Sequence, residues 1–160
     1  ASAAGVLDAW LDFADENDLD PRPRDTTSTA QKRQVEERLP YWVFRYEDWE
    51  VRVGKNAADN DELTRRHSQL KDLWLHAQGV GGSHVVIRSG GRPVPRAIVE
   101  DAARIAAWYS KSKTSGTVAV HVVERRYVRK GRKAPAGTVK LDRAETVFVE
   151  PGIPDGWEQD

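Results

Sequence analysis

Residues 72–88 read DLWLHAQGVGGSHVVIR, and this stretch contains two predicted strands joined by a glycine-rich loop. Residues 72–77 and 84–88 carry aromatic, leucine and β-branched side chains in short runs, which is typical of strands. The segment 79–82 between them holds three glycines, and it interrupts both runs, so it predicts a loop.

Upstream of this stretch the sequence predicts two further strands and a helix. Residues 41–46 are aromatic and β-branched, and residues 49–53 alternate between apolar and charged side chains, as a strand with one buried face does. Asn56 followed by Asp59 is typical of a helix start, because the Asn side chain accepts a backbone N–H and an acid is favoured in the first turn. We therefore expect a helix over about residues 57–69.

Downstream, the sequence predicts a second helix and three more strands. The helix opens at Pro95, and its apolar side chains share one face. Residues 117–123 alternate and predict a strand, and residues 138–141 and 146–150 predict a terminal hairpin. The order ββαββαβββ predicts an α+β fold, in which a mostly antiparallel sheet carries two main helices on one of its faces.

The composition suggests three parts of the chain. We expect residues 1–39 to be a linker or the partly helical tail of a preceding region, residues 40–152 to be the folded domain, and residues 153–160 to be a C-terminal tail. The chain contains no methionine, so we expect a trimmed product or a piece of a longer protein. It contains no cysteine, which excludes thiolate metal sites and fits a reducing compartment.

The formal net charge is zero, but the charges are segregated along the chain. Residues 104–140 contain ten bases and one acid, whereas residues 1–39 and 141–160 are acidic. Arginine and lysine suit phosphate contacts, and an interleaved aromatic such as Tyr127 suits base stacking. The basic segment therefore favours a polyanionic partner, although a solvated loop is the alternative.

Asp72, Trp74 and His76 share one face of a predicted strand, opposite Leu73 and Leu75. An acid, an indole and an imidazole in one row favour a surface on which RNA docks, with Trp74 as a stacking platform. The structural alternative is that Trp74 packs under a helix and Asp72 holds His76 or a loop amide.

Three histidines raise the question of a metal. His76, His84 and His121 lie on three predicted strands and could bind zinc if those strands were neighbours in register. No close histidine pair or carboxylate spacing supports such a site, so we predict no metal and no cofactor. Ser83 and His84 are adjacent, and adjacent strand residues face opposite ways, so they do not form a nucleophile pair.

Several motifs occur together and in a familiar order. They are Val53–Asn56 with Asn60, Asp61 and Leu63, then Asp72–Ala77, Gly82–Ile87, Tyr109–Lys111, Val128–Lys130 and Val147–Val149. Together they resemble the C-terminal RNA-binding domain (NFACT-R) of the NFACT family, which includes the RqcH or fibronectin-binding-like ribosome quality control proteins.

The resemblance implies a cytoplasmic, non-catalytic module that contacts tRNA and/or large-subunit rRNA. It also implies a larger chain with other modules, no membrane contact, and a ribosome quality control factor that rescues stalled ribosomes and promotes untemplated tailing of nascent chains. The expected RNA-binding residues are Lys55, Asn56, Asp72, Trp74, His76, Ser83, His84, Lys111, Lys113, Tyr127, Arg129, Lys130, Arg132 and Lys133.

Two other functions stay open at this point. One is a metal- or histidine-dependent enzyme that processes nucleic acids, with Asp72, His76 and His84 as its reactive groups. The other is a protein-interaction, adhesin-like domain, which the old fibronectin label of the family and the acidic chain ends suggest.

Overall fold

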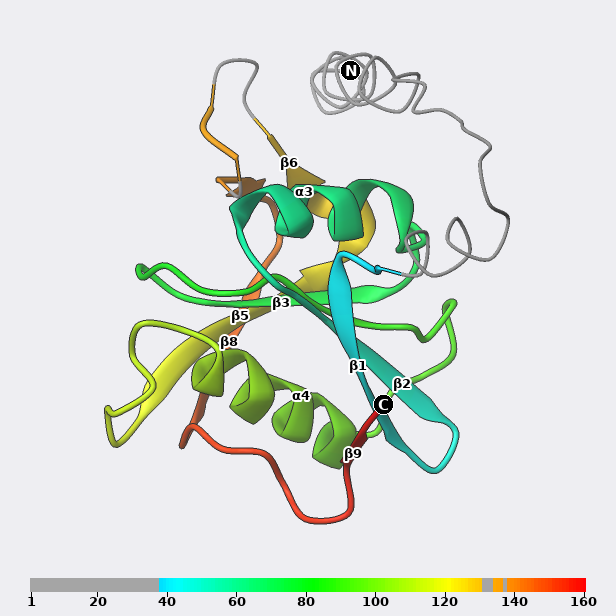
Figure 1. Ribbon diagram of the computed structural model, residues 1–160, viewed down its shortest axis with the longest axis vertical. Helices are drawn as coiled ribbons and strands as arrows, with labels where there is room; N and C mark the ends of the chain where they lie inside the picture. The colour runs from blue at the N-terminus through cyan, green and yellow to red at the C-terminus, as the bar shows by residue number, and fades with distance from the viewer. Residues whose placement is uncertain (1–37, 131–133, 137) are drawn as a thin grey trace, which may run out of the picture.

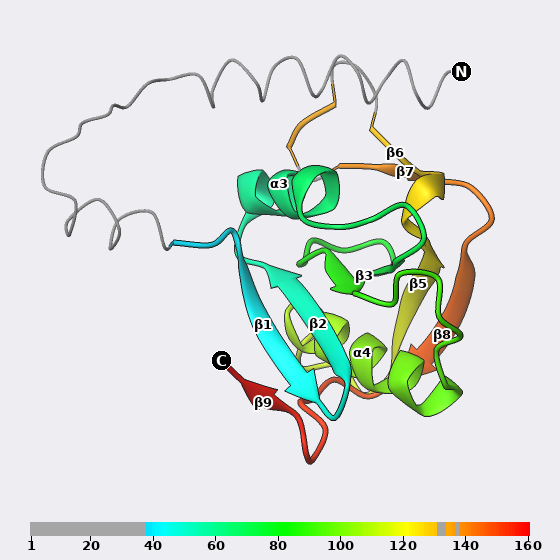
Figure 2. The same cartoon turned by 90° about the vertical axis from the view of Figure 1, so that its right-hand side faces the viewer.

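A seven-stranded antiparallel sheet forms the centre of the fold, with one helix on each face (Figures 1 and 2). The computed structural model describes residues 38–130, 134–136 and 138–160. In chain order the elements are β1 (Tyr41–Tyr46), β2 (Trp49–Gly54), α3 (Ala57–Arg66), β3 (Leu73–Ala77), β4 (Val85–Ile87), α4 (Arg96–Trp108), β5 (Val118–Glu124), the 3-10 turn η2 (Arg125–Tyr127), β6 (Val128–Arg129), β7 (Lys140–Leu141), β8 (Glu145–Val149) and β9 (Glu158–Gln159).

Residues 72–88 lie in the middle of this sheet. The strand order is β8-β5-β3-β4-β2-β1-β9, so β3 has β4 and β5 as its neighbours. All strand pairs of the sheet are antiparallel. The predicted α+β fold with two main helices and an antiparallel sheet is confirmed.

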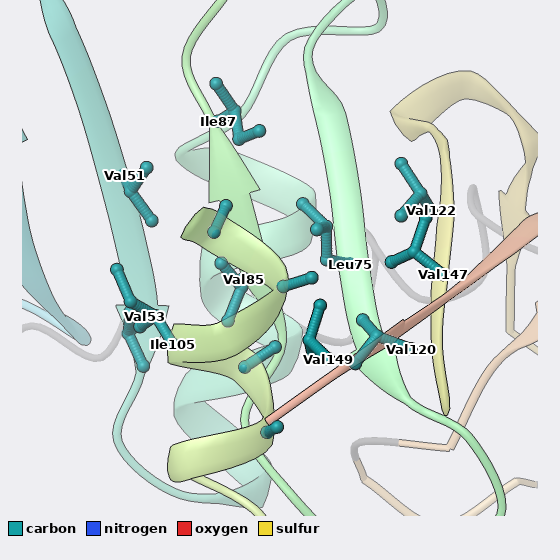
Figure 3. Close-up of a cluster of buried hydrophobic side chains, with 14 of the residues drawn as sticks. Val51, Val53, Leu75, Val85, Ile87, Ile105, Val120, Val122, Val147 and Val149 are labelled. Carbon is teal, nitrogen blue, oxygen red and sulfur yellow. The ribbon is translucent and has the colours of Figure 1, made fainter. Parts of the chain in front are cut away.

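Each face of the sheet has its own hydrophobic core. Leu75, Val85 and Ile105 belong to the larger core, which lies between the sheet and α4 (Figure 3). Trp74, Val86 and Leu63 belong to the smaller core, which lies between the sheet and α3.

The prediction that both helices cover the same face is wrong. Successive residues of a strand point to opposite faces, so Trp74 and Leu75 place bulky apolar groups on both sides of β3. Both faces must therefore be covered. The continuous apolar run of β4 likewise indicates a strand that is buried on both faces.

Two predictions at the C-terminal end are corrected by the pairing. Residues 138–141 and 146–150 do not form a hairpin, because β7 pairs with β6 while β8 pairs with β5. Residues 153–160 are not a tail outside the fold, because β9 pairs with β1. Trp157 is 7% exposed and stacks on Tyr46 at 5.4 Å between ring centroids, and its indole N–H donates to Asp101 at 2.8 Å.

The ends of the helices follow the expected local rules. The Asn56 side chain accepts the backbone N–H of Asp59 at 2.8 Å, which caps α3 as predicted. The helix ends at Arg66, three residues earlier than expected, and α4 begins directly after Pro95. Within the described ranges, no helix combines the length and the apolar character needed to cross a membrane.

Candidate nucleic-acid interface

A cleft of about 1050 Å³ opens where four segments that are distant in the sequence come together. Its walls are the start of α3 (Lys55–Ala57), the β3–β4 loop (Gly79–Ser83) and the end of α4 with Tyr109 and Lys111. Residues 138–141 also line it. In Figure 1 the β3–β4 loop projects to the left, below the start of α3.

The cleft is positively charged. Lys55, Lys111 and Lys140 line it, and the described part of its lining contains no aspartate or glutamate. None of these three ammonium groups forms an ion pair with a described residue, and Lys55 lies 5.8 Å from the centroid of the Trp42 ring. An anionic group that enters the cleft would therefore meet these three cations, and no carboxylate of a described lining residue would compete with it.

The glycine-rich loop is held against the end of α4. The N–H of Ser83 donates to the Tyr109 carbonyl at 3.0 Å, and the N–H of Lys111 donates to the Gly81 carbonyl at 2.8 Å. A Cβ atom at Gly82 would lie 2.8 Å from the Cβ of Ser110, so only glycine permits this approach. The hydrogen bonds place Lys111 at the edge of the cleft.

Two histidines from neighbouring strands lie on its floor. His76 of β3 and His121 of β5 are paired in register, and both line the cleft. Burial lowers the pKa of His76 below its usual 6.5, and the nearby His121 acts in the same direction, while a backbone hydrogen bond with Gly82 opposes them. Nδ1 of His121 is buried and has no hydrogen-bond partner among the described residues.

Residues 39–143 match the family described as the NFACT protein RNA binding domain. The chain belongs to this family. It is 46% identical over 101 residues to the "Rqc2 homolog RqcH" of Bacillus subtilis, a match that covers 63% of this chain and 17% of that protein. It is also 31% identical over 71 residues to the "Ribosome quality control complex subunit NEMF homolog" of Drosophila melanogaster, covering 44% of this chain and 7% of that protein.

A solved structure shares the fold of this NFACT RNA-binding domain. It is the C-terminal part of the fibronectin/fibrinogen-binding protein of Streptococcus suis, with a TM-score of 0.67 and 30% identity. The likeness covers 82% of this chain and 49% of that one. The chain therefore has an NFACT RNA-binding domain of the kind found in ribosome quality control proteins, and it spans less than a fifth of the RqcH protein it matches.

The cleft of the NFACT domain brings together part of the predicted RNA-binding set. Lys55, Lys111 and His76 line it, and neither lysine forms an ion pair with a described residue. Asn56 and Ser83 also line it, but their side chains have structural roles: Asn56 caps α3, and the Ser83 hydroxyl donates to the Gly54 carbonyl at 2.5 Å.

Trp74 is a core residue, which corrects the prediction of an exposed stacking platform. Its exposed fraction is 0%, and its indole N–H donates to the Thr64 hydroxyl of α3 at 3.0 Å. The same hydroxyl hydrogen-bonds Nδ1 of His84 at 2.9 Å, and His84 is also 0% exposed. The physical reason is that α3 covers this face of the sheet, so the structural alternative describes Trp74 correctly.

Asp72 is likewise buried and holds two loops together. Its carboxylate accepts the backbone N–H groups of Gln69 and Gly90, both at 2.8 Å, and pairs with Arg88 at 2.9 Å. Asp72 and His84 thus have structural partners, which weakens the enzymatic alternative. Among the residues that the structure describes, no group of three or more His, Cys, Asp or Glu side chains is placed to hold a metal ion.

The described basic residues after β5 are largely engaged within the protein. Lys130 pairs with Asp61 at 2.7 Å, where both side chains are nearly buried, and Arg129 pairs with Asp142. The guanidinium groups of Arg126 and Arg143 lie 5.3 and 5.0 Å from the ring centroid of Tyr127, which does not line the cleft.

Three other predicted RNA-binding residues are not among the described residues of the cleft lining. Lys113 is exposed, 4.0 Å from the Trp108 ring centroid, and it is not part of the cleft lining. Arg132 and Lys133 lie outside the described residues.

Four residues around the cleft were not predicted as site residues: Trp42, Tyr109, His121 and Lys140. Tyr109 follows α4 directly, is half-buried and lines the cleft, and its ring centroid lies 5.1 Å from that of Trp42. The charge of Lys140 and the imidazole of His121 were visible in the sequence. Their position was not, because it depends on the pairing of β5 with β3 and of β7 with β6.

The two histidines with lowered pKa values predict how stability changes with pH. Burial, reinforced by nearby arginines, lowers the pKa of His67 below 6.5, and burial lowers that of His76. Below pH 6.5 the unfolded chain takes up protons that the folded state resists. The free energy of unfolding should therefore be independent of these groups above pH 6.5, and should fall as the pH drops from 6.5 towards their lowered values.

Urea unfolding at about pH 7.5 and about pH 5.5 checks this prediction, with a lower midpoint expected at the acidic pH. A variant that combines His67→Gln with His76→Gln should lose most of the difference. An unchanged difference in that variant would mean that other groups cause it.

Proposed function

We propose that this NFACT domain contacts tRNA and/or large-subunit rRNA, and that the cleft is its principal RNA contact. One observation carries the proposal: the described lining combines Lys55, Lys111 and Lys140 with no carboxylate. Phosphate contacts dominate the affinity of proteins for nucleic acids, and unpaired lysines on a shared concave surface suit them. Tyr109 and Trp42 lie beside these lysines, where a base could stack.

We further propose that the domain acts as a non-catalytic part of a larger cytoplasmic ribosome quality control factor. The support is its membership in the family and its likeness to proteins named RqcH and NEMF homolog. In such a factor, the module would help to hold the stalled large subunit and tRNA while the whole protein promotes untemplated tailing of the nascent chain. Because the chain spans 17% of the RqcH protein, the remaining modules would be its partners within one polypeptide.

RNA binding is tested by fluorescence anisotropy with mixed tRNA and with fragments of large-subunit rRNA across a salt series. If three or more phosphates are contacted, the logarithm of the association constant should fall against the logarithm of salt with a slope of about −2 or steeper. Double-stranded DNA of equal charge serves as the comparison for purely electrostatic binding. Absent binding at low salt, or binding that salt leaves unchanged, would contradict the proposal.

A further inference from the structure

The floor of the cleft differs from its rim in chemistry. The rim holds the lysines, whereas the floor holds the His76 and His121 imidazoles, with the Trp74 ring behind His76 at 5.9 Å between centroids and an interplanar angle of 25°. A flat site for phosphates alone needs no such floor. Pockets that enclose organic ligands have volumes of about 300–1000 Å³ and combine apolar walls with few polar groups.

We infer that the cleft takes one unstacked nucleotide of an RNA strand, with the base against His76 and His121 and the neighbouring phosphates at the lysine rim. This inference rests on the proposed function and adds the ligand class of the site, a single nucleobase with its ribose phosphate. Its volume of about 1050 Å³ is sufficient for one such group.

The polar side chains at the floor of the cleft support a base as the ligand, because one of them lacks a hydrogen-bond partner among the described residues. The Asn60 amide donates to the Gly82 carbonyl at 3.3 Å and its oxygen accepts the His84 N–H at 3.0 Å, so Asn60 is engaged within the protein. The Ser83 hydroxyl is bound to Gly54. His121 differs, because its buried Nδ1 has no partner among the described residues. If the imidazole turns this buried nitrogen towards the cleft, a base edge offers the donors and acceptors that it needs.

The charge state of the floor also suits a base. The pKa of His76 is lowered by burial, so its imidazole is neutral at pH 7. The backbone hydrogen bond with Gly82 uses the one N–H of this neutral imidazole, so the other ring nitrogen is left as an acceptor; it suits an N–H donor of a base edge better than a phosphate, which offers acceptors only. Phosphates are therefore expected at Lys55, Lys111 and Lys140 instead.

The test follows the histidine side-chain resonances of the ¹⁵N-labelled chain by NMR. The probes are the four nucleoside 5′-monophosphates and, as the baseless control, ribose 5-phosphate. The nucleotides should shift the ring signals of His76 and His121, and ribose 5-phosphate should leave them in place. His67 lies against Tyr41, outside the cleft lining, and serves as the internal control.

A matched pair of variants sharpens the result. His121→Leu should weaken nucleotide binding roughly fivefold, the loss expected for about one hydrogen bond, while His67→Gln should not change it. Equal shifts with ribose 5-phosphate, or no histidine shift with up to about 10 mM nucleotide, would overturn the inference. Binding of mixed tRNA to the same sample separates the two proposals. If the chain binds tRNA but the His76 and His121 resonances do not shift, only the base site is rejected. If the chain does not bind tRNA, the proposed function is rejected.

Discussion

Replacing Lys55, Lys111 and Lys140 together by alanine should weaken tRNA binding by roughly tenfold to 100-fold at moderate salt, because three phosphate contacts are removed. The slope of the logarithm of the association constant against the logarithm of salt should become shallower by about 2, since each contact to a single strand contributes about 0.7. Lys111 and Lys140 are exposed and Lys55 is half-buried, so the variant should remain folded. Anisotropy across a salt series measures both quantities, and circular dichroism checks the fold.

The matched control is Lys71→Ala with Arg92→Ala and Arg96→Ala, which removes the same charge. Lys71 precedes β3 and Arg96 begins α4, so both lie at the ends of these elements opposite to the cleft. This control should change affinity much less and should not alter the salt slope by a comparable amount. If both triple variants weaken binding equally, the affinity for RNA depends on the total charge of the chain, and the cleft is not the RNA contact.

Trp74→Ala should lower the free energy of unfolding by about 3–5 kcal/mol, the usual cost of removing a large buried aromatic side chain. The ring is 0% exposed, and its loss would leave a cavity between β3 and α3 and would remove one of the two hydrogen bonds of the Thr64 hydroxyl. A loss of this size is comparable to the whole stability of many domains. Urea unfolding measures the effect.

Trp74→Phe separates the structural role from a stacking role. It keeps an aromatic ring but removes the indole N–H, so we expect a loss of about 1–3 kcal/mol from the missing hydrogen bond to Thr64. The folded Trp74→Phe variant should bind tRNA as the wild type does, because the ring does not reach solvent. Thr64→Val, which removes the other partner of the same hydrogen bond, is the control. If folded Trp74→Phe loses tRNA affinity while Thr64→Val retains it, Trp74 contacts the RNA and its purely structural role is wrong.

The elements themselves were predictable because their signals are local. They depend on residues that are close together in the sequence: the alternation at residues 49–53, the cap at Asn56 and the helical apolar face after Pro95. The antiparallel α+β class followed from their order. The face occupied by α3, the separate partners of β7 and β8 and the return of β9 to β1 depend on contacts between distant segments, which no local pattern specifies.

The site divides in the same way. The sequence alone determined the family, since the motifs around Trp74 and His84 resemble an RNA-binding family that the comparisons confirm. Only the tertiary structure decided which residues meet the solvent. It buried Trp74, Asp72 and His84, paired Lys130 with Asp61, and brought Lys140 and Lys55 into the lining of one cleft. The physical reason is that the sequence gives the chemical type of each side chain directly. Which side chains are exposed, and which lie close together, depends on how whole elements pack against both faces of the sheet.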